Sequence, residues 1–255
     1  MGGDVNRWIQ REALTGAVAR AVCVPRAGGS ARDFDPWRAP LGSQVELCAV
    51  QLPGRLDRYT EPALSDLWKI AAAVADALSG LPYLPLVLFG DCMGALVAFE
   101  AARALRRSGG VLPSALIVSS YPAPHRARTE RTYADGTADD FRRRLQDVGG
   151  VPAAAIGDDE LFELMLPTLR ADFAAFEGYV YTEDEPLDVD IHALLGRTDP
   201  YYSAADLAGW QRHTSRELEL TLFEGGHFFL REGDAAAAFV RDVAVAAREA
   251  NSARS

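Results

Sequence analysis

Short apolar runs alternate with segments of helical periodicity along most of the chain. The apolar runs are rich in Val, Leu and Ile and end at turn residues or prolines, which predicts strands. They cover 20–25, 45–53, 85–90, 114–120, 190–196 and 218–226. Helical spacing predicts helices over 64–79, 95–110 and 235–250. Apolar strands separated by helices are typical of a mostly parallel sheet covered on both faces, so the pattern predicts an α/β fold.

Residues 121–185 interrupt this alternation with two consecutive helical patterns and no strand between them. The patterns are ADDFRRRLQDVGG (138–150) and DDELFELMLPTLRADFAAFEGY (158–179). Pro167 predicts a break or kink in the second helix after Leu166. A helical insertion after a central strand is typical of a lid over a site at the carboxyl ends of the strands. The alternative is a helical layer that fills out the domain.

Composition and charge narrow the class of protein. Of the 255 residues, 49% are apolar, and the formal net charge is −10. This size fits one domain with a large core, so we expect a single domain over 1–255 with 121–185 inserted in it. The acidic charge argues against a nucleic-acid-binding protein and against attraction to anionic membranes.

The N-terminal segment and the cysteines indicate a cellular compartment. MGGDVNRWIQ lacks the features of a signal peptide, and no apolar run approaches the ~20 residues of a membrane span. Three cysteines (Cys23, Cys48 and Cys92) are too few, and odd in number, for a disulfide framework. We therefore expect a reduced, cytoplasmic protein.

Cys92 lies between an apolar strand and a helical pattern, in the sequence Gly90-Asp91-Cys92-Met93-Gly94. This G-x-C-x-G pattern has the form of a nucleophile elbow, a sharp turn from a strand into a helix. The two glycines let neighbouring backbone approach closely, and the N–H groups at the start of the helix favour an anion there. The alternative is a buried structural cysteine, the usual place of a free thiol.

A nucleophile of this kind needs a histidine base and an acid that orients the histidine. Asp199 follows the strand that ends near Gly196, and His227 follows a later strand behind two glycines. The chain order of nucleophile, acid and histidine is that of the α/β-hydrolase fold. We therefore predict this fold and a Cys92–His227–Asp199 triad, with no metal.

The remaining histidines and the oxyanion hole complete the predicted site. His125, His192 and His213 fall in the insertion, inside a strand and in a polar helical segment, so we expect structural or solvated positions for them. The N–H of Met93, directly after the nucleophile, is one expected oxyanion-hole donor. A second donor is expected from the loop VPRAGGS (24–30) after an early strand.

The chain resembles the type II thioesterases, free-standing editing hydrolases of polyketide and nonribosomal peptide assembly lines. The resemblance is carried, in chain order, by CVPRAGGSARDFDPW, VELCAVQLPGRLDRYTEP, LVLFGDCMGALVAFEAARAL, LPTLRADFAAFEGY, GRTDP, GWQRHT and FEGGHFFLRE. It implies Cys92 as nucleophile, Asp199 as acid and His227 as base. It also implies Ala27 and Met93 as oxyanion-hole donors and 121–185 as a flexible lid.

Two positions depart from the family pattern, which usually reads Gly-His-Ser-Met-Gly. Cys92 replaces the serine, and a thiol is intrinsically the stronger nucleophile. An acyl-Cys92 intermediate would be a thioester, close in free energy to the substrate, so its formation would be readily reversible. Asp91 replaces the histidine, and we expect its side chain to point away from Cys92, as a hydrogen-bonding neighbour without a catalytic role.

The resemblance implies an acyl or aminoacyl thioester on the phosphopantetheine arm of a carrier protein as substrate, with no further cofactor, and we expect a monomeric enzyme. Arg126, Arg128, Arg131 and Arg142–Arg144 are candidates for carrier docking, or else form a solvated helix face with nearby aspartates. The leading hypothesis is a thioester hydrolase. The alternatives are an acyltransferase that moves the acyl group between carriers through Cys92, and a binding protein that has lost activity.

Overall fold

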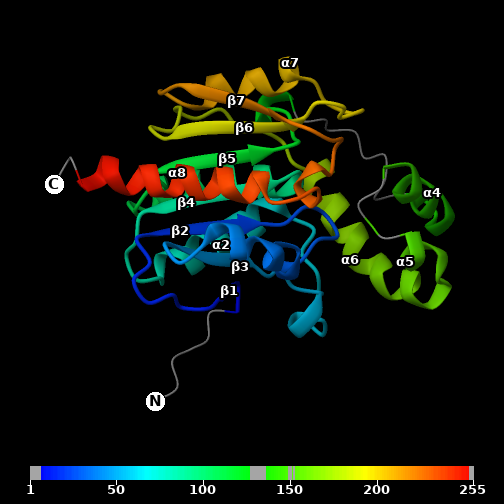
Figure 1. Ribbon diagram of the computed structural model, residues 1–255. Helices are drawn as coiled ribbons and strands as arrows, with labels where there is room; N and C mark the ends of the chain where they lie inside the picture. The colour runs from blue at the N-terminus through cyan, green and yellow to red at the C-terminus, as the bar shows by residue number, and fades with distance from the viewer. Residues whose placement is uncertain (1–6, 127–135, 149–150, 152, 253–255) are drawn as a thin grey trace.

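Seven strands form one sheet in the order β1-β3-β2-β4-β5-β6-β7 (Figure 1). The computed structural model describes residues 7–126, 136–148, 151 and 153–252. The strands are β1 (Ile9–Arg11), β2 (Ala19–Val24), β3 (Val45–Val50), β4 (Leu86–Asp91), β5 (Ala115–Ser119), β6 (Asp190–Gly196) and β7 (Leu218–Phe223). Only the pairing of β1 with β3 is antiparallel. The predicted, mostly parallel α/β fold is therefore confirmed, and only the short β1 was not predicted.

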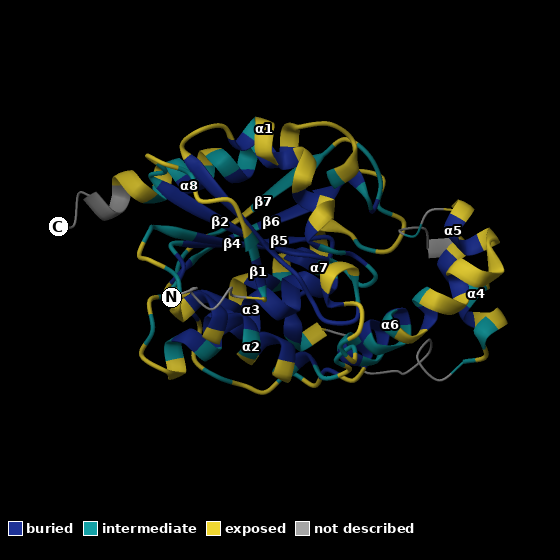
Figure 2. Ribbon diagram, turned by 90° about the horizontal axis from the view of Figure 1, so that it is seen from below, coloured by how far each residue is buried: buried dark blue, intermediate teal, exposed yellow. Residues whose placement is uncertain are grey.

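Helices cover both faces of this sheet (Figure 2). On one face, α2 (Leu67–Ser79) and α3 (Met93–Arg107) pack on alternate strand residues such as Leu88. On the other face, α1 (Arg38–Leu41), the 3-10 helix η1 (Ala31–Trp37) and α8 (Ala235–Ser252) pack on the residues between, such as Val87 and Phe89. Because successive side chains of a strand point to opposite faces, the strands β2 to β6 each contribute to two cores.

The register brings the carboxyl ends of the parallel strands to one edge of the sheet. Val24 of β2 pairs with Gly90 of β4, and Asp91 of β4 pairs with Ser119 of β5. At the same edge, Gly196 of β6 pairs with Phe223 of β7. The loops that follow β2, β4, β6 and β7 therefore leave the sheet side by side, and these loops carry the predicted site residues.

The helices between β5 and β6 are α4 (Ala138–Val148), α5 (Ala153–Gly157) and α6 (Asp159–Glu177). Figure 1 shows α4 and α5 apart from the sheet, beyond the carboxyl ends of the parallel strands, with α6 leading back toward it. These helices share a separate apolar cluster, made by Phe141, Leu145, Ile156, Phe162, Leu166, Leu169 and Phe173.

Of the break or kink predicted at Pro167, the break is wrong, because α6 runs from Asp159 to Glu177 without interruption. A proline inside a helix removes one N–H donor, which leaves the carbonyl four residues earlier without its partner. That carbonyl belongs to Glu163, and both Glu163 and Pro167 are exposed residues. The buried side chains Leu166 and Leu169 hold the two halves of the helix on the same cluster.

The short helices α7 (Ala204–Leu207) and η4 (Ala208–His213) lie between β6 and β7. Of the helices that the structure describes, none combines the length and the apolar character needed to cross a membrane.

Candidate active site

Cys92 occupies a strained turn between β4 and α3. Its φ of 51° and ψ of −113° lie in a region that non-glycine residues rarely adopt, at a cost of about 1–3 kcal/mol. A Cβ at Gly90 would lie 2.2 Å from the carbonyl oxygen of Gly94, and a Cβ at Gly94 would lie 2.3 Å from that of Val24. Only glycine fits at these two positions, so the G-x-C-x-G spacing is a requirement of the turn.

Asp199 and His227 meet at the same edge, from the loops after β6 and β7. The Nδ1 atom of His227 lies 2.8 Å from Oδ2 of Asp199, and both side chains are buried. The other oxygen, Oδ1, accepts the backbone N–H groups of Tyr201 at 2.8 Å and Tyr202 at 3.1 Å. The carboxylate is therefore fixed from both sides, and it fixes the imidazole ring in turn.

The histidine also contacts the cysteine. Burial alone would lower the pKa of His227, but hydrogen bonds to Asp199 and to Cys92 outweigh it and raise the pKa to about 10. The structure thus brings together Cys92, His227 and Asp199, which are far apart in the sequence. The arrangement can hold a proton on the imidazole next to the thiol sulfur.

The other two cysteines lie in different environments. Burial raises the pKa of Cys23 well above its usual value, and burial together with the charge of Glu46 raises that of Cys48 to about 12. Both thiols are inaccessible, whereas Cys92 is partly exposed. Because the thiolate is the reactive form of cysteine, Cys92 is the thiol with both access and a basic neighbour.

The two predicted oxyanion-hole donors belong to the first residue of α3 and to the loop after β2. Met93 is the first residue of α3, so its N–H has no partner within the helix. Ala27 lies in the loop after β2, in a turn closed by the N–H of Gly29, which donates to the carbonyl of Arg26 at 3.0 Å. In a trans peptide the C=O of one residue and the N–H of the next point in opposite directions. The C=O of Arg26 points toward Gly29, so the N–H of Ala27 points away from Gly29.

Asp91 lines a separate cavity of about 290 Å³ together with Arg26, Asp33 and Phe228. Asp91 is 9% exposed, and burial raises the pKa of its carboxyl group to about 6 against the charges of Arg26 and His227. Arg26 is itself paired with Asp33. Asp91 could be singled out from the sequence, but this group of charges could not, because its members come from the loop after β2, from η1 and from the end of β4.

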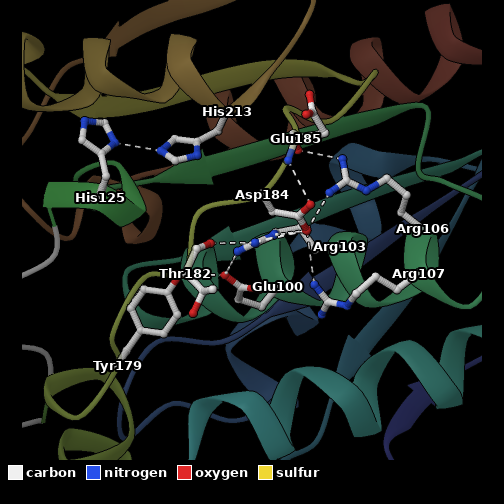
Figure 3. A network of polar contacts seen from close by, with 10 residues as sticks. All are labelled: Glu100, Arg103, Arg106, Arg107, His125, Tyr179, Thr182, Asp184, Glu185 and His213. Carbon is white, nitrogen blue, oxygen red and sulfur yellow. Dashed lines mark hydrogen bonds and ion pairs between the residues drawn. The ribbon is translucent and has the colours of Figure 1, made fainter.

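The remaining histidines make contacts of other kinds. His125 Nδ1 lies 2.8 Å from His213 Nε2 (Figure 3). His213 is buried rather than solvated, and burial followed by the charge of His125 lowers its pKa to about 3. His192 in β6 contacts Glu219 and the ring of Phe239.

The candidate docking arginines are engaged with neighbouring groups where the structure describes them. Arg142 pairs with Asp159 at 2.5 Å and lies over the ring of Phe162, and Arg143 pairs with Asp140. Arg126 donates to the carbonyl of Ala205. Arg128, Arg131 and the side chain of Arg144 lie outside the described part of the structure. These contacts favour the interpretation of a charged helix face for Arg142 and Arg143.

Comparison with known proteins gives consistent matches over nearly the whole chain. The family model described as Thioesterase domain matches residues 20–245. The gramicidin S biosynthesis protein GrsT of Aneurinibacillus migulanus is 35% identical over 230 residues, which is 90% of each chain. Thioesterase PikA5 of Streptomyces venezuelae is 37% identical over 90% of this chain and 82% of its own. The structure of the type II thioesterase BorB from the borrelidin biosynthetic cluster has a TM-score of 0.85 at 35% identity, covering 93% of this chain and 97% of BorB.

Proposed function

This chain belongs to the type II thioesterases of nonribosomal peptide and polyketide biosynthesis, and we propose that it hydrolyses acyl or aminoacyl thioesters on carrier proteins through an acyl-Cys92 intermediate. The observation that supports this most is the line of contacts from Cys92 through His227 to Asp199. The motifs in the sequence predicted the same family.

In the proposed first half-reaction, the proton of the Cys92 thiol passes to His227, and the sulfur attacks the thioester carbonyl carbon. The N–H groups of Ala27 and Met93 donate to the oxyanion that forms. The bond from carbon to the pantetheine sulfur then breaks, and the leaving thiolate takes the proton from His227. The raised pKa of His227 supports this role, because the ring must hold the proton until the leaving group needs it.

In the second half-reaction, neutral His227 takes a proton from water as the water oxygen attacks the acyl carbon. The bond from that carbon to Cys92 breaks, the free acid leaves, and the proton returns to the sulfur. The charge of Asp199 stabilises the imidazolium in both half-reactions and keeps Nδ1 protonated.

The cysteine nucleophile supports one alternative, an acyltransferase. Acyl-Cys92 is a thioester, so a second carrier thiol can accept its acyl group with little change in free energy. Such an enzyme would transfer the acyl group between carriers, with the same triad and the same oxyanion hole. Hydrolysis and transfer differ only in the acceptor, water or thiol.

We further propose that the segment 121–185 is a lid inserted in a single domain, and that the carrier arm enters beneath it. The support is its position, with α4 and α5 beyond the carboxyl ends of the strands (Figure 1) and α6 packed against the loop that carries Ala27.

Intact-protein mass spectrometry tests the proposal. Wild type and Cys92→Ser would be incubated with an acyl-loaded carrier protein, with and without an empty second carrier. Release of free acid by the wild type, with the second carrier left empty, is the expected result. Acyl transfer to the second carrier faster than to water would establish the transferase instead. Absence of both release and an acyl-Cys92 adduct would refute an enzymatic role.

A further inference from the structure

The turn that carries Ala27 depends on a precise backbone conformation. Gly28 occupies its third position with a φ of +70°, as the third residue of a type II turn requires, and the Gly29 N–H closes the turn onto Arg26. The direction of the Ala27 N–H is set by this closure. A rotation of either neighbouring peptide would change the direction of that donor.

A carboxylate from helix α6 holds this turn from outside. Asp172 is 1% exposed, and its Oδ2 accepts the N–H of Gly28 at 2.7 Å. Arg55, from the loop after β3, donates to both oxygens of Asp172, at 2.8 and 2.7 Å, and to the carbonyl of Gly29 at 2.9 Å. Asp172 thus contacts the peptide before Gly28, Arg55 contacts the peptide after Gly29, and each satisfies the other's charge.

Apolar side chains of α6 contact the same turn. A Cβ at Gly28 would lie 2.6 Å from Cδ2 of Leu169, so that side chain lies directly against the turn. Ala27 packs on the apolar cluster shared by α4, α5 and α6. Leu169 and Asp172 lie three positions apart, on one face of the helix. The oxyanion-hole turn is therefore built partly from a helix of the segment proposed as the lid.

We propose that Asp172, braced by Arg55, is a positioning residue that fixes the Ala27 N–H for the oxyanion, so that the oxyanion hole is complete only while α6 is docked. This inference rests on the proposed thioesterase function. Neither residue touches the reacting atoms, and the effect passes through the Gly28 peptide.

The test compares Asp172→Asn with Thr168→Ala. Thr168 lies one turn earlier on α6 and donates to the carbonyl of Gly54 at 2.8 Å, so its hydrogen bond anchors the same helix to the loop after β3 and not to the 26–29 turn. In Asp172→Asn, either orientation of the amide places its NH2 group against a donor from Gly28 or Arg55. Should that variant not fold, Arg55→Lys keeps the charge and removes the two-point contact with Asp172.

Two reactions of Cys92 distinguish a positioning role of Asp172 from a purely structural one. Turnover of a hexanoyl thioester of N-acetylcysteamine needs the oxyanion hole, whereas alkylation by iodoacetamide displaces iodide and forms no oxyanion. Since loss of a whole oxyanion-hole donor costs ~100–1,000-fold, misplacement of one in Asp172→Asn should lower kcat roughly 30-fold, leaving KM and the alkylation rate within about threefold. Thr168→Ala should leave turnover and alkylation within about threefold of wild type.

Equal losses of turnover and alkylation, unchanged turnover in Asp172→Asn, or an equal loss in Thr168→Ala would overturn the inference. A wild type that forms no acyl-Cys92 and turns over no thioester would instead refute the proposed function, whatever the variants do.

Discussion

Replacing Asp199 by Asn should place the imidazole of His227 in the wrong tautomer. The Oδ1 atom of Asp199 accepts two backbone N–H groups, from Tyr201 and Tyr202, so the carbonyl oxygen of an asparagine must take that place. Its NH2 group then faces Nδ1 of His227, which must accept rather than donate. The ring proton moves to Nε2, on the side of Cys92, where it blocks transfer of the thiol proton.

The structure sets the scale of the loss. The pKa of His227 is about 10, against 6.5 for an ordinary histidine, and this interval corresponds to about 5 kcal/mol at 1.36 kcal/mol for each factor of ten. The hydrogen bond to Asp199 raises this pKa most, ahead of the hydrogen bond to Cys92, so loss of the carboxylate removes a large share of this energy. The tautomer penalty adds to this, so kcat/KM at neutral pH should fall by ~100–1,000-fold.

Saturation kinetics with a small acyl thioester between pH 6 and 9 measure this effect, and circular dichroism melting checks the fold. Asp206→Asn is a matched control, because Asp206 accepts from Ser203 in the same loop region and caps α7, whereas the side-chain hydrogen bonds of His227 go to Asp199 and Cys92. It should retain activity within about threefold, as expected of an exposed cap. An Asp199→Asn enzyme within fivefold of wild type would refute the reasoning, since the imidazole would then not need its carboxylate.

Three further predictions concern stability. Gly94→Ala places a Cβ 2.3 Å from the carbonyl oxygen of Val24, so urea denaturation should show a loss of about 1–3 kcal/mol, and an unchanged midpoint would contradict the close approach. Tyr179→Phe removes a buried 2.6 Å hydrogen bond to the Glu100 carboxylate (Figure 3) and should lower the free energy of unfolding by ~1.5–3 kcal/mol. A double-mutant cycle with Glu100→Gln that shows no coupling would disprove this contribution. Because folding raises the pKa of His227, its protonated ring stabilises the fold fully below about pH 6.5, and this is lost as pH rises through about 10. The stability difference between wild type and His227→Gln should therefore shrink toward pH 10, and a constant difference would be the contrary result.

The triad positions could be predicted from sequence because each residue follows a strand of a parallel sheet. Strands that end at Asp91, Gly196 and Phe223 bring the next loops to a common edge, and Cys92, Asp199 and His227 lie in those loops. Chain order and the flanking glycines then suffice to identify the candidates. No geometric information beyond the strand pattern was needed.

Asp172 and Arg55 could not be predicted in the same way. They are 117 positions apart and meet because α6 leads from α5 back to the loop after β3. Their motifs, LPGR and LRADF, carried the resemblance without assigning a role. The helix break predicted at Pro167 was wrong for a related reason. Tertiary packing stabilises that helix, and local sequence propensity does not report tertiary packing.

On the proposed function, the docking of α6 has a consequence for the choice between hydrolysis and transfer. Acylation and deacylation of Cys92 both pass through an oxyanion, so both need the Ala27 donor that Asp172 holds. Displacement of α6 would then slow attack by water and attack by a carrier thiol to the same extent. The choice of acceptor must be made elsewhere, by what can reach the acyl carbon beneath α4 and α5. Substitutions at Asp172 should accordingly change the rate of acyl transfer but keep the ratio of free acid to acylated acceptor, which the two-carrier experiment measures directly.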